Sequence, residues 1–311
     1  MTSATTTRET GRLEQRAASR PAGSAREPWR WTPYLFLLPG IALLVVFHVI
    51  PIGISIVGAL FKQNLMGEAR FAGLQNYIGL LSDPAFWNSL WVTLLFNLVI
   101  NPLQIGLALL LALLTFKPGF GVNLFRAAYF VPMTMSLAAA AMLWNLLLDP
   151  NIGIVNAILK ALGFSAQPFF NSASTALWAI VGITLWKGVG YWMMFLIAGL
   201  QNIPRELYEA ARIDGASPFR QFIHVTLPML KRVLLFVLVA DTALNFLLFA
   251  PVYLITAGGP AGSTDLLMYR TYKSAFVNLD TGTALATSTI VLMIIAVIAA
   301  VEFRLMRVKG E

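Results

Sequence analysis

Two charged side chains stand inside segments that are otherwise almost wholly apolar. Lys187 lies in the segment 175–200 and Asp241 lies in 233–257, with Asn245 one helical turn after Asp241. A charge in hydrocarbon is costly unless it is paired or faces water. Two hypotheses therefore stay open: a buried Lys187–Asp241 pair that locks two helices together, or a polar lining of a path through the membrane.

Recognition of a polar solute in such a path would need aromatic faces together with amide and hydroxyl groups. Aromatic residues near the ends of apolar segments are more typical of membrane-interface anchors. Asn97, Asn101 and Gln104 share one helical face, an arrangement that favours interhelical hydrogen bonds or, alternatively, a cavity lining. The candidates for lining the path are Lys187, Tyr191, Trp192, Asp241, Asn245, Phe249, Asn101 and Asn145.

Covalent chemistry has little support in the sequence. The chain has no cysteine, and its two histidines, His48 and His224, lie on different segments. Paired acids, a Ser/His arrangement or a metal-ligand cluster are not found at membrane depth, so no catalytic residue and no metal site is predicted. The chain also lacks a Gly-x-x-x-x-Gly-Lys-Ser/Thr phosphate loop, so we expect no ATP and no other cofactor to be bound by it. An intramembrane enzyme is the weakest hypothesis.

The composition is that of a membrane protein. Of the 311 residues, 58% are hydrophobic and only 12% are charged, whereas a soluble domain carries about a quarter charged residues. Six apolar runs are long enough to cross a bilayer, which predicts an all-α polytopic fold with six transmembrane helices. The prolines inside them predict kinks. The predicted spans are 34–60, 90–116, 127–148, 175–200, 233–257 and 281–301.

The distribution of lysine and arginine predicts the orientation. If the N-terminus is cytoplasmic, 16 of the 22 Lys and Arg residues fall on the cytoplasmic side, five fall outside, and Lys187 lies within a span. Both termini and the loop 201–232 are then cytoplasmic. The net charge of +8 reflects this bias rather than nucleic-acid binding.

Residues 1–30 are expected to form a disordered basic tail, followed by one transmembrane domain over 31–311. The first apolar run is too long for the core of a cleavable signal peptide, so a signal anchor is favoured.

The loop 201–232 is a charged island between two apolar segments, and its residue types predict two short helices. Pro204 can start the first helix without losing a needed donor. Gly215 can end it with a positive φ. Ser217 is a favourable N-cap for a second helix that runs to Pro228. We expect a stiff element, parallel to the membrane, that can move as one piece.

The same loop carries a pattern. Glu-Ala-Ala at 209–211 is followed by three residues, a glycine, nine residues and Val-Thr-Leu-Pro at 225–228. This resembles the EAA loop of the membrane subunits of ATP-binding-cassette importers, with Val225 in place of the usual isoleucine. The segments 185–217 and 248–276, including Ala-Gly-Gly-Pro at 257–260, are similar to the permeases of carbohydrate-type importers. Many members have an aspartate where this chain has Ala250, so the family's sugar contacts are not carried over.

The resemblance implies an importer permease subunit that pairs with a second permease subunit in the membrane lipid. It further implies two ATP-binding subunits, which hold ATP and Mg, and an extracytoplasmic solute-binding protein, all at a bacterial inner membrane. On this analogy, the contact with the ATPase is made by Glu209, Ala210, Ala211, Asp214, Gly215, Leu227 and Pro228.

The solute expected from the resemblance is a small sugar. A neutral sugar is favoured, because Lys187 is the only cation inside the spans, and glycerol-phosphate-type solutes are the alternative. A stand-alone secondary transporter or channel, with an ion or proton relay through Lys187 and Asp241, is the competing class. It would leave the pattern at 209–228 unexplained.

Overall fold

The computed structural model describes residues 32–63 and 69–306. The predicted basic tail, 1–30, therefore lies outside the described residues. The chain divides into two compact units, residues 1–54 and residues 55–311.

The first unit contains the beginning of one apolar helical stretch. It comprises α2 (Thr32–Leu44), a π-helical turn η1 (Val45–Val49) and the first residues of α3 (Ile50–Gly58). Together they are long and apolar enough to cross a membrane, from Tyr34 to Gly58.

The second unit is almost entirely helical. A two-stranded antiparallel hairpin, β1 (Phe61–Gln63) and β2 (Ala69–Phe71), pairs Lys62 with Arg70. The helices that follow are α4 (Gln75–Leu81), α5 (Pro84–Thr115), α6 (Val122–Thr134), α7 (Leu137–Leu147), α8 (Ile154–Ala161), η2 (Phe169–Asn171), α9 (Ala176–Gln201), α10 (Arg205–Ile213), α11 (Pro218–Gln221), η3 (Phe222–Thr226), α12 (Leu227–Phe246), η4 (Val252–Thr256), α13 (Leu267–Tyr272), η5 (Lys273–Val277) and α14 (Thr281–Met306).

The all-α membrane fold is confirmed. In the described residues, five helical stretches are long and apolar enough to span a membrane, and a sixth span is possible if the bent pair α6 and α7 counts as one. The third predicted span, 127–148, is therefore not one straight helix: α6 and α7 meet at 101°. Pro132 lies in the last turn of α6, and Ser136 caps α7 by accepting a hydrogen bond from the Ala139 N–H. The two residues end one helix and start the next.

The fifth predicted span also differs from the structure. The helix runs from Pro218 to Phe246, so it begins well before 233 and ends before 257. The apolar residues after Phe246 leave it at Leu247 and continue in the separate turn η4. Pro251, which has no N–H to donate, lies just after that break, at the start of the next helical turn.

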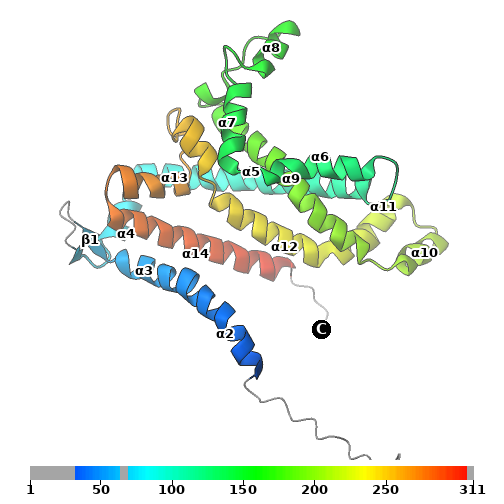
Figure 1. Cartoon of the computed structure of the whole chain (residues 1–311), viewed down its shortest axis with the longest axis horizontal. Helices are drawn as coiled ribbons and strands as arrows, with labels where there is room; N and C mark the ends of the chain where they lie inside the picture. The colour runs from blue at the N-terminus through cyan, green and yellow to red at the C-terminus, as the bar shows by residue number, and fades with distance from the viewer. Residues whose placement is uncertain (1–31, 64–68, 307–311) are drawn as a thin grey trace, which may run out of the picture. The chain divides into compact units, whose positions relative to one another are not determined.

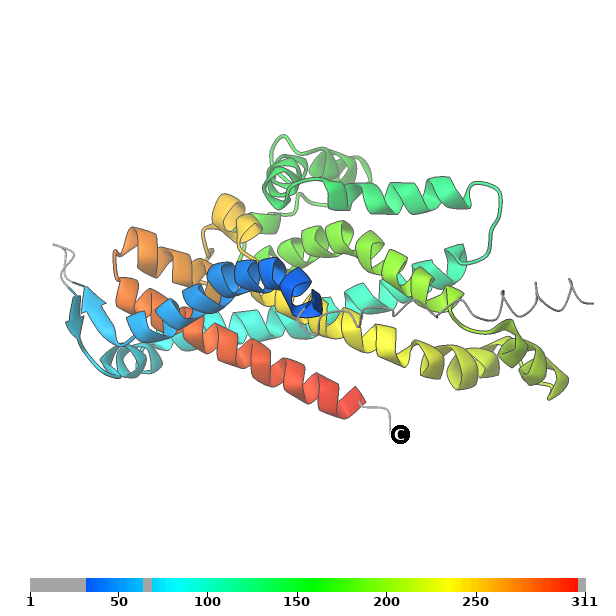
Figure 2. The same ribbon diagram turned by 60° about the horizontal axis from the view of Figure 1, so that its bottom comes forward.

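The core of the second unit is built around α5 and α9. At one level Phe96 and Ile100 of α5 pack with Ile180 of α9. At another, Met193 of α9 and Leu230 of α12 lie in a second buried cluster. α12 packs against α5, and Figure 2 shows α14 (red) running beside α12 (yellow). Within this unit, α10 lies at one end of the bundle, and α4 with the hairpin lies at the other (Figure 1).

Candidate functional site

The loop between α9 and α12 has the helix ends that its sequence predicts. Pro204 precedes α10, Gly215 follows it with φ +73°, and the Ser217 side chain accepts a hydrogen bond from the Arg220 N–H at 3.4 Å. The predicted end of the second helix at Pro228 is wrong, because α11, η3 and α12 form one continuous helix. The ring of a proline inside a helix clashes with the carbonyl four residues earlier. The wider π-helical turn η3, immediately before Leu227, accommodates Pro228.

The side chains of α10 face outward. Glu209 and Ala210 are exposed, and none of the residues of α10 is buried. Two apolar side chains flank the polar surface, with Ile213 exposed at 86% and Phe219 at 71%. Charged residues with large exposed apolar neighbours are typical of a surface that another protein covers. The arrangement is suited to docking, since it leaves the short helix almost free of intramolecular cover.

A residue pair that the sequence did not single out fastens α10 to the base of α12. The hydroxyl groups of Tyr208 and Thr226 lie 2.9 Å apart in a hydrogen bond. Tyr208 also packs against the buried cluster that includes Leu200, Ile203 and Leu230. Tyr208 precedes the first residue of the loop pattern, and Thr226 stands at a variable position between Val225 and Leu227, so the pattern gives no signal for either. The loop is thus held to the spanning helix through a defined contact.

Asp241 is bound by two donors inside the bundle. Its Oδ1 atom accepts hydrogen bonds from Trp192 Nε1 at 2.7 Å and from Gln104 Nε2 at 3.0 Å. The side chain is 1% exposed. The three residues belong to α12, α9 and α5, so one carboxylate joins three long helices.

A second group of polar side chains continues this network. Asn245 donates to Asn101 Oδ1 at 2.8 Å, and Asn101 donates to Thr242 Oγ1 at 2.8 Å. Thr242 in turn donates to Glu302 of α14 at 3.1 Å. Thr242 and Glu302 were not expected from the sequence, although an acid just beyond the last apolar run is a signal for Glu302. Of the predicted path residues, Asn101, Trp192, Asp241 and Asn245 are therefore brought together, buried and hydrogen-bonded within the chain.

The predicted Lys187–Asp241 pair is wrong. Lys187 Nζ instead donates to the backbone carbonyl of Met133 in α6 at 3.2 Å and lies 3.7 Å from its sulfur atom. Lys187 and Trp192 are five residues apart, which places them about 140° apart around the axis of α9. Because Trp192 faces Asp241, Lys187 faces a different neighbour.

The other predicted path residues lie apart from this network. Asn145 is exposed on α7, and Tyr191 makes edge contacts with the Trp192 and Phe195 rings. Phe249 belongs to an aromatic cluster that the sequence did not predict. Its ring lies 5.1 Å from that of Tyr253 in a stacked arrangement and 5.0 Å from that of Tyr272.

This aromatic cluster is partly accessible. The Tyr272 hydroxyl donates to that of Tyr253 at 3.4 Å, and the rings of Tyr253 and Phe276 are exposed. The cluster therefore offers aromatic faces with two phenol groups, a combination suited to binding a sugar. The sequence signal was a spacing of four residues in each of two separate segments, Phe249–Tyr253 and Tyr272–Phe276.

A further polar group fastens the loop that carries the Ala-Gly-Gly-Pro sequence. Arg270 pairs with Asp83, the N-cap of α5, and its guanidinium also lies 3.7 Å from Asp265. Ser89 donates to Asp265 at 2.7 Å. Burial raises the pKa of Asp265, and the Ser89 hydrogen bond and the Arg270 charge oppose this effect. Asn88 donates to the Gly262 carbonyl at 3.0 Å, so the loop is bonded to the first turns of α5.

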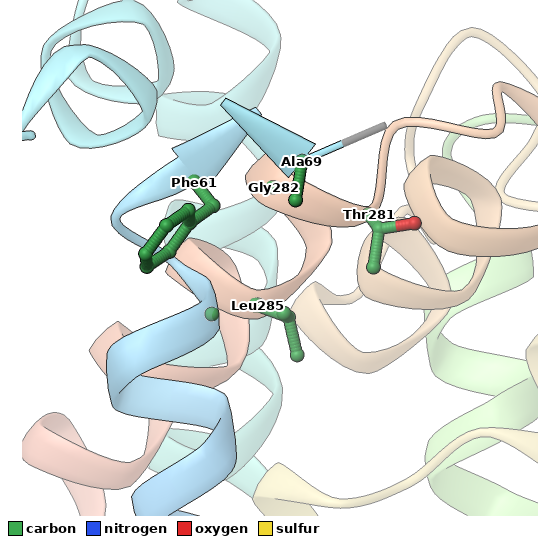
Figure 3. A pocket seen from close by; sticks show the side chains of 6 residues that line it. Phe61, Ala69, Thr281, Gly282 and Leu285 are labelled. Carbon is green, nitrogen blue, oxygen red and sulfur yellow. The ribbon is translucent and has the colours of Figure 1, made fainter. Parts of the chain in front are cut away.

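A pocket of about 280 Å³ lies between the end of α3, the hairpin and the start of α14. Figure 3 shows Phe61, Ala69 and Leu285 around it, with the Thr281 hydroxyl at its edge. A side chain at Gly282 would collide with Asn76 Nδ2, which donates to the Phe61 carbonyl at 2.9 Å. The lining of this pocket is mostly apolar and does not suit a polar solute. In the described part of the chain, no cluster of three or more His, Cys, Asp or Glu side chains could hold a metal ion.

Comparison with known proteins finds a consistent set of similarities. Residues 104–307 match the family model described as "Binding-protein-dependent transport system inner membrane component". The sn-glycerol-3-phosphate transport system permease protein UgpA of Agrobacterium fabrum is 34% identical over 279 residues, which cover 89% of this chain and 95% of that protein. The protein of the same name from Yersinia pseudotuberculosis is 32% identical over 281 residues, 90% of this chain and 95% of that protein.

Two solved structures have a similar fold. A chain of a bacterial transporter involved in the import of the acidic polysaccharide alginate has a TM-score of 0.76 at 21% identity, with 90% of this chain and 96% of that chain covered. A chain of a bacterial alginate transporter in complex with an alginate pentasaccharide-bound periplasmic protein has a TM-score of 0.74 at 21% identity, covering 89% and 94%.

Proposed function

Because the chain belongs to the family of binding-protein-dependent transport system inner membrane components, we propose that it forms half of a translocation pore and receives movement from a separate ATPase through α10. The observation that carries this proposal is the exposed helix α10, which bears Glu209 and is bonded to the base of a long membrane helix. The ATPase contact comprises Glu209, Ala210, Ala211, Asp214, Gly215, Leu227 and Pro228.

The fold supports a simple transmission of force. A displacement of α10 passes through the Tyr208–Thr226 bond to the continuous helix from Pro218 to Phe246. The buried bonds of Asp241 and Asn245 then join that helix to α5 and α9. These helices move as one body, since breaking the buried bonds would leave polar groups unsatisfied. Repeated displacement exposes the path to one side of the membrane and then to the other.

The assembly that this function needs contains other chains. A second permease subunit completes the pore, two ATP-binding subunits hold ATP and Mg, and a solute-binding protein delivers the solute from outside. The chain itself binds no cofactor and performs no covalent step. Both termini and α10 lie on the cytoplasmic side of a bacterial inner membrane.

The solute class follows from the relatives and from the aromatic cluster. We assign a sugar or a sugar-like polyol, with Tyr191, Phe249 and Lys187 along the path and Asn145 near its edge. A glycerol-phosphate is the second candidate. Two observations support this second candidate. Lys187 pairs with no carboxylate in the described part of the chain, and the similar permease of Agrobacterium fabrum is named for sn-glycerol-3-phosphate transport.

Charge reversal at Glu209 tests the role of α10. In the complete transporter in vesicles, Glu209→Arg should lower solute uptake by roughly thirtyfold, the effect of about 2 kcal/mol lost at a charged interface. ATP hydrolysis should no longer respond to the solute-binding protein. Glu206→Arg is the matched control, because Glu206 is an exposed acid in the first turn of the same helix but outside the pattern. Normal uptake by Glu209→Arg would refute the proposal.

A further inference from the structure

The break between α6 and α7 places a helix end inside a segment that is apolar on both sides. The two helices meet at 101° after Thr134. The last carbonyl groups of a helix have no partner within it, and hydrocarbon supplies none. The carbonyl oxygens at the end of α6 must therefore find donors elsewhere.

Three carbonyl groups in the last turn of α6 have identifiable donors. The Val131 carbonyl accepts from the Thr134 hydroxyl at 2.7 Å, and the Pro132 carbonyl accepts from the Met135 N–H at 3.4 Å. The Met133 carbonyl accepts from Lys187 Nζ at 3.2 Å. The first two donors are local, so the Lys187 bond is the one that ties this end to another helix.

The packing of α6 on α9 brings Lys187 to this position. At Gly190 the two backbones are so close that a side chain would collide with the Tyr129 carbonyl. Met133 lies one turn after Tyr129, and Lys187 lies about one turn before Gly190. Because the two helices run antiparallel, Lys187 and Met133 lie next to each other. Next to Lys187, Trp186 packs edge-on against Trp144 of α7 at a centroid distance of 5.5 Å. Adjacent residues of α9 thus contact both halves of the broken segment.

We propose that Lys187 is a positioning residue that holds the C-terminal end of α6 and thereby fixes the angle at which α7 leaves it. An ammonium group suits this place, because the end of a helix carries a partial negative charge and a lysine stem can reach it along apolar surface. This role needs neither contact with a solute nor pairing with Asp241, and it is additional to the place of Lys187 along the proposed path. The angle of α7 matters because α7 packs beside η4, which carries Tyr253 of the aromatic cluster.

The angle between α6 and α7 can be measured without a transport assay. This chain has no cysteine, so spin labels at Leu124→Cys in α6 and Leu146→Cys in α7, both exposed positions, would be its only labelled sites. This chain is labelled before it is assembled with its partners. In the complete transporter in nanodiscs, pulsed electron resonance should give one narrow distance distribution. Lys187→Met should broaden this distance distribution or shift it by several ångströms, whereas Lys187→Arg, which keeps the charge, should give the parent distribution. Lys187→Gln also removes the charge and is measured in parallel. If one of the two variants fails to assemble into the transporter, the other still tests the proposal.

The control is Lys231→Met, which removes a lysine from α12 and should leave the distribution unchanged. An unchanged narrow distribution in Lys187→Met or Lys187→Gln would overturn the proposal, as would a failure of Lys187→Arg to restore it. The inference rests on the proposed function only for its importance in transport. A negative result for Lys187 would not affect the proposal for Glu209, and a negative result for Glu209 would not affect the proposal for Lys187.

Discussion

The loop around α10 and the interior of the bundle use polar residues in opposite ways. On α10, Glu209 is exposed, and no hydrogen bond or ion pair holds its side chain within the residues that the structure describes. In the bundle, Asp241 is fully enclosed and joins three helices through Trp192 and Gln104. The difference lies in burial: Asp241 adds rigidity to the interior, whereas Glu209 is left accessible to the partner proposed above. The distinction can be tested, because the two roles respond differently to loss of charge and to loss of a hydrogen-bond acceptor.

The largest effect on stability is expected at Asp241. Asp241→Leu leaves the buried donors of Trp192 and Gln104 unsatisfied, which should destabilise the folded chain by about 3 kcal/mol. Asp241→Asn is the matched control, because its amide oxygen can still accept both hydrogen bonds. The midpoint of thermal unfolding of the purified transporter measures the two variants. If Asp241→Asn is as damaging as Asp241→Leu, the negative charge is what matters, and an ion relay becomes the better hypothesis.

Local chemistry made the loop predictable. The cap at Ser217 and the positive φ of Gly215 depend on a few neighbouring residues, and both are found as predicted. The same reasoning failed at Pro228, because it treated the proline as a helix end. A π-helical turn before it lets the helix continue. Local signals therefore gave the helix starts more reliably than the continuity of helices.

The interior could be predicted only in part. The sequence indicates that Lys187 and Asp241 need partners at membrane depth, and it places Asn101 and Gln104 on one face of α5. It does not give the rotation of α9 relative to its neighbours, and that rotation decides whether Asp241 meets Trp192 or Lys187. Nor does it reveal that the Met133 carbonyl accepts from Lys187, because that carbonyl lacks a partner within its own helix only where α6 ends. Backbone partners of this kind depend on tertiary structure.

A smaller effect is expected at the junction between the two regions. Tyr208→Phe removes the hydroxyl bonded to Thr226, at a cost of about 1 kcal/mol. Because this bond links α10 to the spanning helix, we expect the ratio of solute transported to ATP hydrolysed to fall, with little change in the ATPase rate. Thr226→Val and the double variant complete a double-mutant cycle. Additive effects of the two substitutions would contradict a direct bond and would place the rigidity of the loop elsewhere.

The smallest effect concerns Asp265, which lies between the other two acids in character: it is largely buried, yet it is near the charged Arg270. Burial raises its pKa in the folded chain, so the folded state holds the proton over a range of pH in which the unfolded chain has already released it. Stability should therefore fall as the pH rises from the ordinary carboxyl pKa to the raised value, and it should be constant above that value. Asp265→Asn is always neutral and still accepts from Ser89, so it should remove this part of the pH dependence and stabilise the chain slightly at neutral pH. Unfolding midpoints of the parent and the variant across the acidic range measure the slope. The same slope in both proteins would mean that the Arg270 charge and the Ser89 hydrogen bond cancel the effect of burial on the pKa of Asp265, which would then resemble a surface acid more than Asp241.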